Sequence, residues 1–519
     1  MKTHNQRFPP THPPFGDGLI EGADPVDALS PAEALFEQWR ARVGLVLGPL
    51  MGFVLAVFPP FDVSASAQIL TGIMVWVGIY WMTEPIPIPV TALLGVTACV
   101  VLGIAPAKEA FAPFGHPVIF LLLGSLLLAQ AMMVHGVDRR IALWCLSRPA
   151  VHRSPARILV AFGAITAFLS MWISNTAATA MMYPIALGVL ASLRRAGVRT
   201  AGGYGTTVLL MIAYAASVGG IGTLIGTPTN LIGAGIILDR LSITLSFLDW
   251  LAFGVPILCV SFLALTGLLF LSHRPPTADT AAFAALIARE RHELGPWRRG
   301  EINAAIAFGV AVALWVLPGA VGLLVGMESP SARWVERRLP EGIVALLAAS
   351  LLFLFPVGDR VGAGTLSWQD AVRIDWGTLV LFGGGLALSN LMFQTGLSAA
   401  LGQAFMQAFQ VETRWELTLM AIAMGVLMSE LASNTASAGL VVPLVIAIAQ
   451  SAGMDPLLPA VGACLGASFG FMLPISTPPN AIVYASGLIP MITMIRVGLI
   501  FDLLGIVVIW GMLRLVGPG

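Results

Sequence analysis

The chain is dominated by a succession of apolar runs, each about as long as a lipid bilayer is thick. A helix needs about 20 apolar residues to cross the hydrocarbon core, where all its backbone groups must be paired. Runs of this kind begin near Val43, Ile69, Val90, Val118, Thr206, Phe247, Ile302, Gly342, Thr378, Leu457 and Val497. With 57% hydrophobic and only 10% charged residues, the chain is predicted to be an all-α polytopic membrane protein with about 11 transmembrane helices.

Two further apolar stretches, residues 156–193 and 415–450, are long enough for two short helices each. Each stretch carries a polar triplet at its centre, Ser174-Asn175-Thr176 in the first and Ser433-Asn434-Thr435 in the second. Irregular polar backbone is tolerated at membrane depth only where protein or a water-filled cavity covers it. We therefore predict that both stretches are re-entrant hairpins, which enter and leave the membrane on one side.

The two hairpins belong to an internal duplication. The triplets lie 259 residues apart, and the Thr-Pro-x-Asn sequences that follow them, at 227–230 and 477–480, lie 250 residues apart. This shift moves each element five spans along the chain, and a repeat displaced by an odd number of spans is inverted in the membrane. Inverted repeats place a substrate site at their interface, near the middle of the bilayer.

The basic residues predict the orientation. If the N-terminus is cytoplasmic and the hairpins do not cross, 20 of the 27 Lys and Arg residues lie on the cytoplasmic side. This excess favours a cytoplasmic N-terminus and an outside C-terminus. Residues 1–42 lack the apolar core of a signal peptide and are expected to form a cytoplasmic tail. The expected location is the bacterial inner (plasma) membrane.

The duplicated motifs have the chemistry of an anion site. A helix N-terminus presents unpaired N–H groups and the positive end of a dipole, so it binds anions without a charged side chain. Thr227 and Thr477 suit N-cap positions, with Pro228 and Pro478 at the first helical position. Neither motif contains Lys or Arg, so the expected ligand is a small anion with two negative ends, held by neutral donors. The candidate substrate-binding residues are Ser174, Asn175, Thr176, Thr227, Ser433, Asn434, Thr435, Thr477 and Pro478.

Cations are candidates for the same region, because broken-helix carbonyls and side-chain oxygens coordinate Na⁺ in such folds. The alternative is that these residues only cap and pack helices. Glu430, an acid inside an apolar stretch, could attract a cation, carry a proton or accept hydrogen bonds from the hairpin backbone. The candidate Na⁺ ligands are Ser170, Ser174, Asn175, Gly219 and Gly222 near the first triplet, and Ser429, Ala432, Asn434 and Ser476 near the second.

A resemblance to a known family rests on these motifs. Residues 467–483, ASFGFMLPISTPPNAIV, look like the C-terminal signature of the divalent-anion:sodium symporter family, which includes dicarboxylate, citrate and sulfate carriers. The paired triplets and residues 80–87 are similar as well, and the resemblance covers residues 43–517. It implies a homodimer in which each protomer has a scaffold domain and a transport domain that moves across the membrane like an elevator.

The resemblance implies a division of the chain into six parts. These are the tail 1–42, scaffold halves 43–150 and 301–411, transport halves 151–275 and 412–519, and a cytoplasmic loop 276–300. Each transport half contains one hairpin and one broken span.

The expected function is secondary active transport of C4-dicarboxylates of the succinate, malate and fumarate class, coupled to Na⁺. We expect no organic cofactor, no nucleic-acid partner and no enzymatic activity, since no span centre offers a His or Lys as general base. The alternatives are a Na⁺-independent dicarboxylate exchanger and a sulfate or tricarboxylate carrier of the same fold. The preferred anion, the stoichiometry, and the roles of Glu430 and the N-terminal tail stay open.

Overall fold

The computed structural model describes residues 31–58, 63–195, 203–273, 275–276, 280–326, 329–358, 364–409 and 411–518. Within these residues the fold is helical, and the only strand-like pairing is an isolated bridge between Pro356 and Gly364. Most of the expected N-terminal tail, residues 1–30, lies outside the described residues. Residues 31–42 form the start of the first helix.

The first half of the chain contains helices α1 (Pro31–Val57), α2 (Ala65–Thr83), α3 (Ile88–Val101), α4 (Ala107–Phe111), η1 (Ala112–Gly115), α5 (Pro117–His135), α6 (Val137–Leu146), η2 (Val151–Arg153), α7 (Pro155–Ser170), α8 (Asn175–Arg195), α9 (Tyr204–Gly220), α10 (Pro228–Leu241) and α11 (Phe247–Ser272). The second half contains α12 (Ala281–Glu293), α13 (Arg299–Val325), α14 (Pro330–Arg338), α15 (Glu341–Leu354), α16 (Trp368–Ala371), α17 (Trp376–Gln394), α18 (Leu397–Phe409), α19 (Arg414–Leu431), α20 (Asn434–Ser451), α21 (Leu457–Gly466), α22 (Pro478–Tyr484) and α23 (Met491–Val516).

Nine helices in the described part of the chain are long and apolar enough to cross a membrane, namely α1, α2, α5, α8, α11, α13, α17, α20 and α23. Every one of the eleven predicted apolar runs begins inside a helix. Seven of those helices are among the nine, and the other four, α3, α9, α15 and α21, are shorter. The prediction of an all-α, multi-pass membrane protein is confirmed, whereas the re-entrant path of the triplet-bearing segments stays a prediction.

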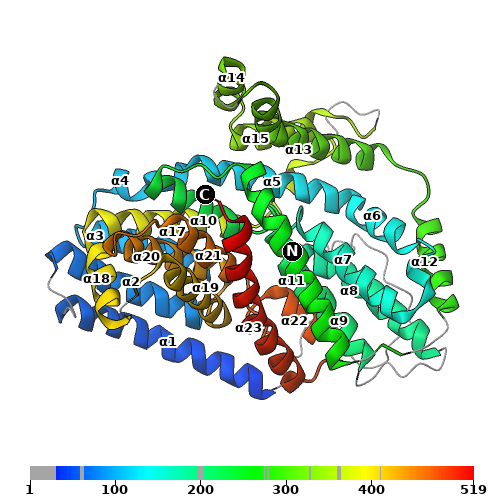
Figure 1. Cartoon of the computed structure of the whole chain (residues 1–519), viewed down its shortest axis with the longest axis horizontal. Helices are drawn as coiled ribbons and strands as arrows, with labels where there is room; N and C mark the ends of the chain where they lie inside the picture. Colours follow the sequence, from blue (N-terminus) through cyan, green and yellow to red (C-terminus); the bar gives the residue numbers. More distant parts are fainter. Residues whose placement is uncertain are drawn as a thin grey trace, which may run out of the picture.

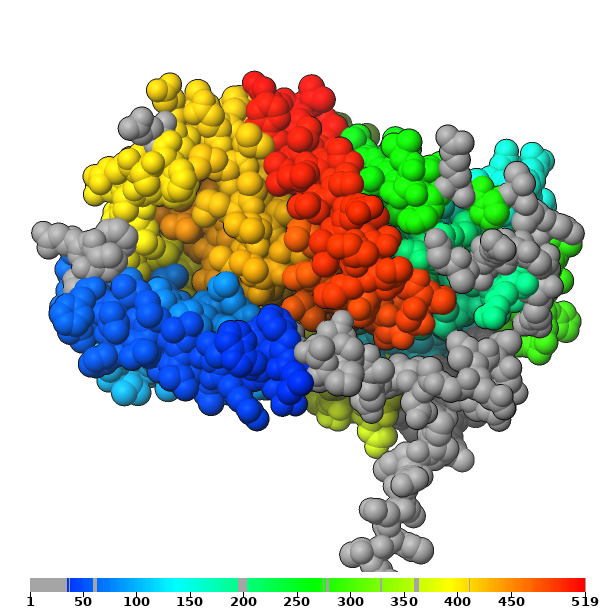
Figure 2. Space-filling view, turned by 90° about the horizontal axis from the view of Figure 1, so that it is seen from below, coloured from blue at the N-terminus to red at the C-terminus, as the bar shows by residue number. Residues whose placement is uncertain are grey.

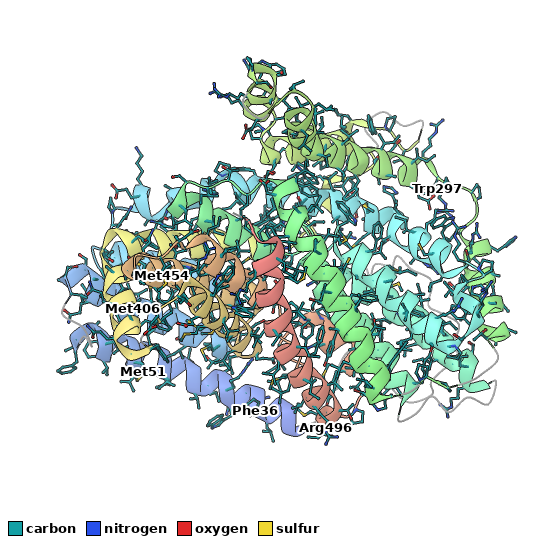
Figure 3. The ribbon with its side chains drawn as sticks, viewed as in Figure 1. Phe36, Met51, Trp297, Met406, Met454 and Arg496 are labelled. Carbon is teal, nitrogen blue, oxygen red and sulfur yellow. The ribbon has the colours of Figure 1, made fainter. Side chains whose placement is uncertain are left out.

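The outer surface of the helices is apolar, as contact with lipid hydrocarbon requires. On α1, Phe36 and Phe53 are 55% and 68% exposed, and Figure 3 labels Phe36 and Met51 along this helix. Leu323 and Leu324 on α13 are even more exposed. Figure 2 shows α1, in blue, as an outer ridge of the molecule. Exposed apolar patches of this extent favour a membrane environment over water.

The two halves interlock in the centre of the molecule. Helix α7 packs on α9 in the first half, and α19 packs on α21 in the second. Across the halves, α8 contacts α22 and α20 contacts α10, while α11 packs along α23, as Figure 1 shows. A Cβ atom on Gly425 of α19 would lie 2.6 Å from the Ala463 carbonyl oxygen of α21, so glycine permits this close packing. The helices that bear the repeated motifs therefore lie side by side.

Candidate functional site

The first triplet forms the turn between α7 and α8. Helix α7 ends at Ser170 and α8 begins at Asn175, as predicted. The Ser174 hydroxyl oxygen accepts a hydrogen bond from the Ala177 N–H at 3.2 Å, which caps α8. The Ser170 hydroxyl donates to Oδ1 of Asn175 at 2.7 Å. The Asn175 side chain is thereby held against the end of α7.

The second triplet repeats this geometry between α19 and α20. The Ser433 hydroxyl oxygen accepts from the Ala436 N–H at 3.3 Å. The Ser429 hydroxyl donates to Oδ1 of Asn434 at 2.8 Å, across the same separation of five residues. The duplication seen in the sequence is therefore matched by equal hydrogen bonds.

The Thr-Pro pairs restart two interrupted helices, as predicted. Helix α9 ends at Gly220 and α10 begins at Pro228, and α21 ends at Gly466 and α22 begins at Pro478. The Thr477 hydroxyl oxygen caps α22 by accepting from the Asn480 N–H at 3.4 Å. Thr227 occupies the corresponding N-cap position, but its hydroxyl makes no capping bond.

The asparagine of each Thr-Pro-x-Asn motif braces the loop before its helix. Nδ2 of Asn230 donates to the carbonyl oxygens of Gly220 at 2.9 Å and Thr223 at 2.7 Å. Nδ2 of Asn480 donates to the carbonyl oxygens of Gly470 at 3.3 Å and Leu473 at 3.0 Å. Each asparagine therefore donates to the carbonyl oxygens of the residues ten and seven positions before it. This bracing role was not assigned from the sequence, although the repeated asparagine was its signal.

A cavity of about 560 Å³ collects all nine candidate substrate-binding residues. The first residues of α8, α10, α20 and α22 line it, so four helices begin at one space. The dipole argument is strongest for α8, α10 and α20, because α22 has only seven residues. The lining residues from α3, α5 and α17 are mainly apolar and include Ile88, Leu122, Leu126, Met133 and Leu381.

Two charged residues at the cavity were not assigned to the site from the sequence. Arg373 and Asp375 line the cavity at the start of α17, and among the described lining residues Arg373 is the only Lys or Arg. The Arg373 guanidinium lies 3.4 Å from a carboxylate oxygen of Asp370 and is well exposed. Residues at a span end give no local sequence signal that they face a distant cavity.

The candidate Na⁺ ligands divide into two groups. Ser174, Asn175, Asn434 and Ser476 line the cavity. The others lie behind its wall and are buried, namely Ser170, Gly219, Gly222, Ser429 and Ala432. Gly219 packs against the backbone of Ala167, and a Cβ on Gly222 would lie 2.5 Å from Leu258. Both glycines therefore also serve close helix packing.

Three carbonyl oxygens converge beside the first triplet. A Cβ atom on Gly226 would lie 2.5 Å from the Gly220 oxygen and 3.1 Å from the oxygens of Ser170 and Met171. A Cβ on Gly220 would lie 2.5 Å from Oδ1 of Asn175. This concentration of neutral oxygens is the donor set that a hard monovalent cation prefers.

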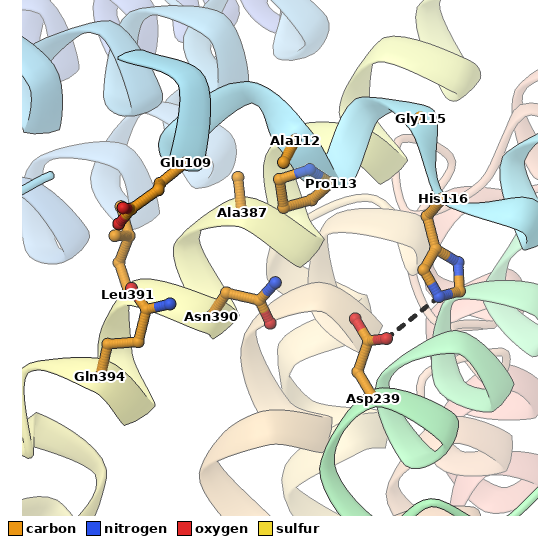
Figure 4. A pocket seen from close by; sticks show the side chains of 10 residues that line it. All are labelled: Glu109, Ala112, Pro113, Gly115, His116, Asp239, Ala387, Asn390, Leu391 and Gln394. Carbon is orange, nitrogen blue, oxygen red and sulfur yellow. Dashed lines mark ion pairs between the residues drawn. The ribbon is translucent and has the colours of Figure 1, made fainter. Parts of the chain in front are cut away.

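A second cavity, of about 380 Å³, contains none of the candidate residues. It lies between η1, α10 and α17, and Figure 4 shows its lining side chains. Nε2 of His116 lies 3.0 Å from Oδ1 of Asp239 on α10. Nδ1 of His116 accepts from the Val118 N–H at 3.3 Å, so a neutral His116 donates to Asp239 through Nε2. This contact joins α10 to the start of α5.

The apolar exterior and the central polar cavity define a multi-pass membrane transporter. A family model for the sodium:sulfate symporter transmembrane region matches residues 39–516. The chain belongs to this family. The resemblance stated from the sequence motifs is thereby confirmed, and the family and its relatives are transporters rather than enzymes.

Relatives match over nearly the whole chain. An uncharacterized transporter of Haemophilus influenzae is 36% identical over 471 residues, covering 89% of this chain and 94% of that protein. The sodium-dependent dicarboxylate transporter SdcS of Staphylococcus saprophyticus is 32% identical over 477 residues, covering 90% of this chain and 89% of that protein.

Two solved structures share the fold at 15% sequence identity. The YdaH transporter of Alcanivorax borkumensis has a TM-score of 0.53 and covers 94% of this chain and 100% of its own. MtrF of Neisseria gonorrhoeae has a TM-score of 0.50 and covers 92% and 94%. At this identity the likeness concerns the fold alone.

Proposed function

We propose that the chain is a secondary active transporter that moves C4-dicarboxylates across the membrane together with Na⁺. The observation that carries this proposal is the cavity at which both triplets and both Thr-Pro restarts meet. Its substrate-facing donors are hydroxyls, amides and helix N-termini from both halves of the chain. Two such clusters facing one space suit an anion with a negative group at each end.

The named relatives support the same assignment. SdcS is called a sodium-dependent dicarboxylate transporter, and the alignment with it covers 90% of this chain. The cation would be held by Ser170, Ser174, Asn175, Gly219 and Gly222 at one site and by Ser429, Ala432, Asn434 and Ser476 at the other. The oxygens that converge around Gly226 add Met171 and Gly220 carbonyls to the first set.

We propose an elevator mechanism with the transport domain formed by residues 151–275 and 412–519. Most polar lining groups come from these residues, whereas the lining residues from α3, α5 and α17 are mainly apolar. A substrate held mainly by one domain can travel with that domain. With a cytoplasmic N-terminus, the span ends at Pro89 and Arg373 lie on the cytoplasmic side, and both residues line the cavity. We therefore assign this structure to the inward-open state.

The central test is uptake of radiolabelled succinate into proteoliposomes containing the purified protein. Asn175→Ala and Asn434→Ala are each expected to abolish uptake, because each removes an amide that lines the cavity and anchors a triplet. Thermal unfolding in detergent checks that each variant is folded. Wild-type uptake in either folded variant would contradict the site assignment.

Replacement of external Na⁺ by choline tests the coupling. Loss of uptake supports symport, and persistence of uptake with dicarboxylate loaded inside would instead support a Na⁺-independent exchanger. Competition by sulfate and citrate tests the two other cargoes. The cavity of about 560 Å³ is large enough to admit a tricarboxylate, so citrate is the more informative competitor.

We also propose a homodimer in the bacterial inner membrane. Helices α13 and α15 expose Leu323, Leu324 and Leu347, and Figure 1 shows both helices standing out from the body of the protomer. Mass measurement by light scattering in detergent tests this arrangement, and a monomer mass would contradict it.

A further inference from the structure

Glu430 is the carboxylate closest in sequence to the second candidate cation site. It follows Ser429 directly on α19 and is only 7% exposed. Its Oε1 accepts from the Met472 N–H at 2.8 Å, and its Oε2 accepts from the Ser476 hydroxyl at 2.6 Å. The Ser476 hydroxyl proton is thus directed at Glu430, which leaves the lone pairs of Ser476 for another partner.

A second acid lies against Glu430. The carboxyl group of Asp502, on α23, is adjacent to the Glu430 carboxyl group and to the Phe471 N–H. Asp502 is 3% exposed, yet neither of its oxygens has a donor in hydrogen-bond geometry. The nearby Tyr214 hydroxyl does not donate to Asp502, because it donates to the carbonyl oxygens of Phe471 at 2.8 Å and Met494 at 3.3 Å.

Among the described residues no Lys, Arg or His is buried, whereas Glu430 and Asp502 are only 7% and 3% exposed. Two adjacent carboxylates out of contact with water are strongly unfavourable unless a cation or a shared proton offsets their charge. The Asp502 oxygens, with no donor in hydrogen-bond geometry, are free to take part in such an arrangement.

The first half of the chain lacks this acid. With the 259-residue offset of the triplets, Met171 occupies the position of Glu430. There the Thr223 hydroxyl donates to the Met171 backbone oxygen, so the contact is neutral. The hydrogen bonds around the two triplets match, but only the second half has a carboxylate at this position.

We propose that Glu430 and Asp502 are the anionic part of the second cation site. This inference rests on the proposed function. Na⁺ at Ser429, Ala432, Asn434 and Ser476 then offsets one negative charge of the acid pair, and a proton shared by the two carboxyl groups accounts for the other. Glu430 also orients Ser476. The two cation sites are unequal, since the first consists of neutral oxygens only. The second site fills first and at lower Na⁺ concentration.

The test uses the full-length protein in proteoliposomes and measures uptake against Na⁺ concentration. Glu430→Gln keeps the side-chain size and removes the charge. We expect the half-activating Na⁺ concentration to rise about 10- to 100-fold, as for other groups that orient metal ligands. Asp502→Asn shifts the half-activating concentration in the same direction.

Glu341→Gln is the matched control, because Glu341 is an equally sized acid whose Oε1 accepts the Phe247 N–H at 2.6 Å, away from the cavity. Its Na⁺ dependence should equal that of the wild type. A second readout is the rise in melting temperature that Na⁺ alone produces, which should need a higher Na⁺ concentration in Glu430→Gln. A purely structural role for Glu430 would lower stability without moving either Na⁺ response.

The outcomes separate this inference from the proposed function. If wild-type uptake requires Na⁺ but both acid variants keep the wild-type half-activating concentration, the acid pair is not part of a Na⁺ site. If wild-type uptake does not depend on Na⁺, the proposed Na⁺ coupling is itself wrong. If the variants instead lose only an uptake component driven by a proton gradient, the pair holds a proton and the Na⁺ assignment is overturned. If Glu430→Gln does not fold, the half-activating Na⁺ concentration of Asp502→Asn tests the inference instead.

Discussion

Gly226 offers the sharpest test of the oxygen cluster beside the first triplet. Its missing Cβ would lie 2.5 Å from the Gly220 oxygen, and real Cβ atoms essentially never approach closer than 3.0 Å. Gly226→Ala therefore requires a backbone shift of about 0.5 Å or more, the difference of these distances. Since the neighbours are backbone atoms, no side chain can yield. Overpacking of this kind costs about 1–3 kcal/mol.

The overpacking distorts the loop that joins α9 to α10 and the turn after α7. If the whole cost appears as weaker Na⁺ binding, about 1–3 kcal/mol corresponds to a roughly 5- to 150-fold lower Na⁺ affinity. The assays are Na⁺-dependent succinate uptake and the Na⁺-induced shift in melting temperature. The expected result is a large loss in both, with the protein still folded.

Gly78→Ala is the matched control, because a Cβ at Gly78 meets no atom within 4 Å. It should transport like the wild type, and an added methyl on a helix is if anything slightly stabilising. The reasoning would be refuted if Gly226→Ala showed normal uptake and a normal Na⁺ response. In that event the three carbonyl oxygens have room to move and are not a cation cradle.

Three further predictions concern other parts of the molecule. Cysteines at His116 and Asp239, in a background without native cysteines, should be joined by a bifunctional thiol reagent and then block uptake, because an elevator must separate α10 from α5; normal uptake after cross-linking would exclude that motion. Burial raises the pKa of Asp138, outside the candidate spans, from 3.8 to about 6. The stability from its protonated form is complete below about pH 4 and is lost as pH rises through 6. Asp138→Asn should therefore increase the unfolding free energy at pH 8 by up to about 3 kcal/mol, but not at pH 4. The measurement is the melting temperature at the two pH values. Arg373→Ala should raise KM about 3- to 10-fold for dianions presented at the cytoplasmic face, and less at high salt; an equal effect on uptake from outside would argue against a scaffold position for Arg373.

Features with a local cause were predictable from the sequence. The apolar runs predicted helices because a bilayer demands continuous apolar, fully hydrogen-bonded segments. The breaks at Asn175, Asn434, Pro228 and Pro478 were predictable because N-caps and prolines act on their own first turn. The regular offset between the repeated motifs predicted that they act together.

Contacts between distant segments were not predictable in the same way. Glu430 was recognised as an unusual acid, but its partner Asp502 lies on another helix. Asp502 carried a signal, a lone acid within the last apolar span, but one sequence does not say which face of α23 meets α19. Arg373 lies just before α17, and its sequence position gave no signal that it lines the cavity.

The sequence by itself determined that the protein is a multi-pass membrane protein, and it located the helices and the polar breaks at the triplets and the Thr-Pro pairs. It also predicted an anion held by neutral donors as the ligand. Only the tertiary structure decided that α8 meets α22 and α20 meets α10, so that four helix starts line one cavity. The physical reason is that apolar helices in lipid select their neighbours by shape and close backbone contact rather than by hydropathy. The same packing placed Asp502 beside Glu430, next to the second candidate cation site, whereas Met171 occupies the position of Glu430 at the first.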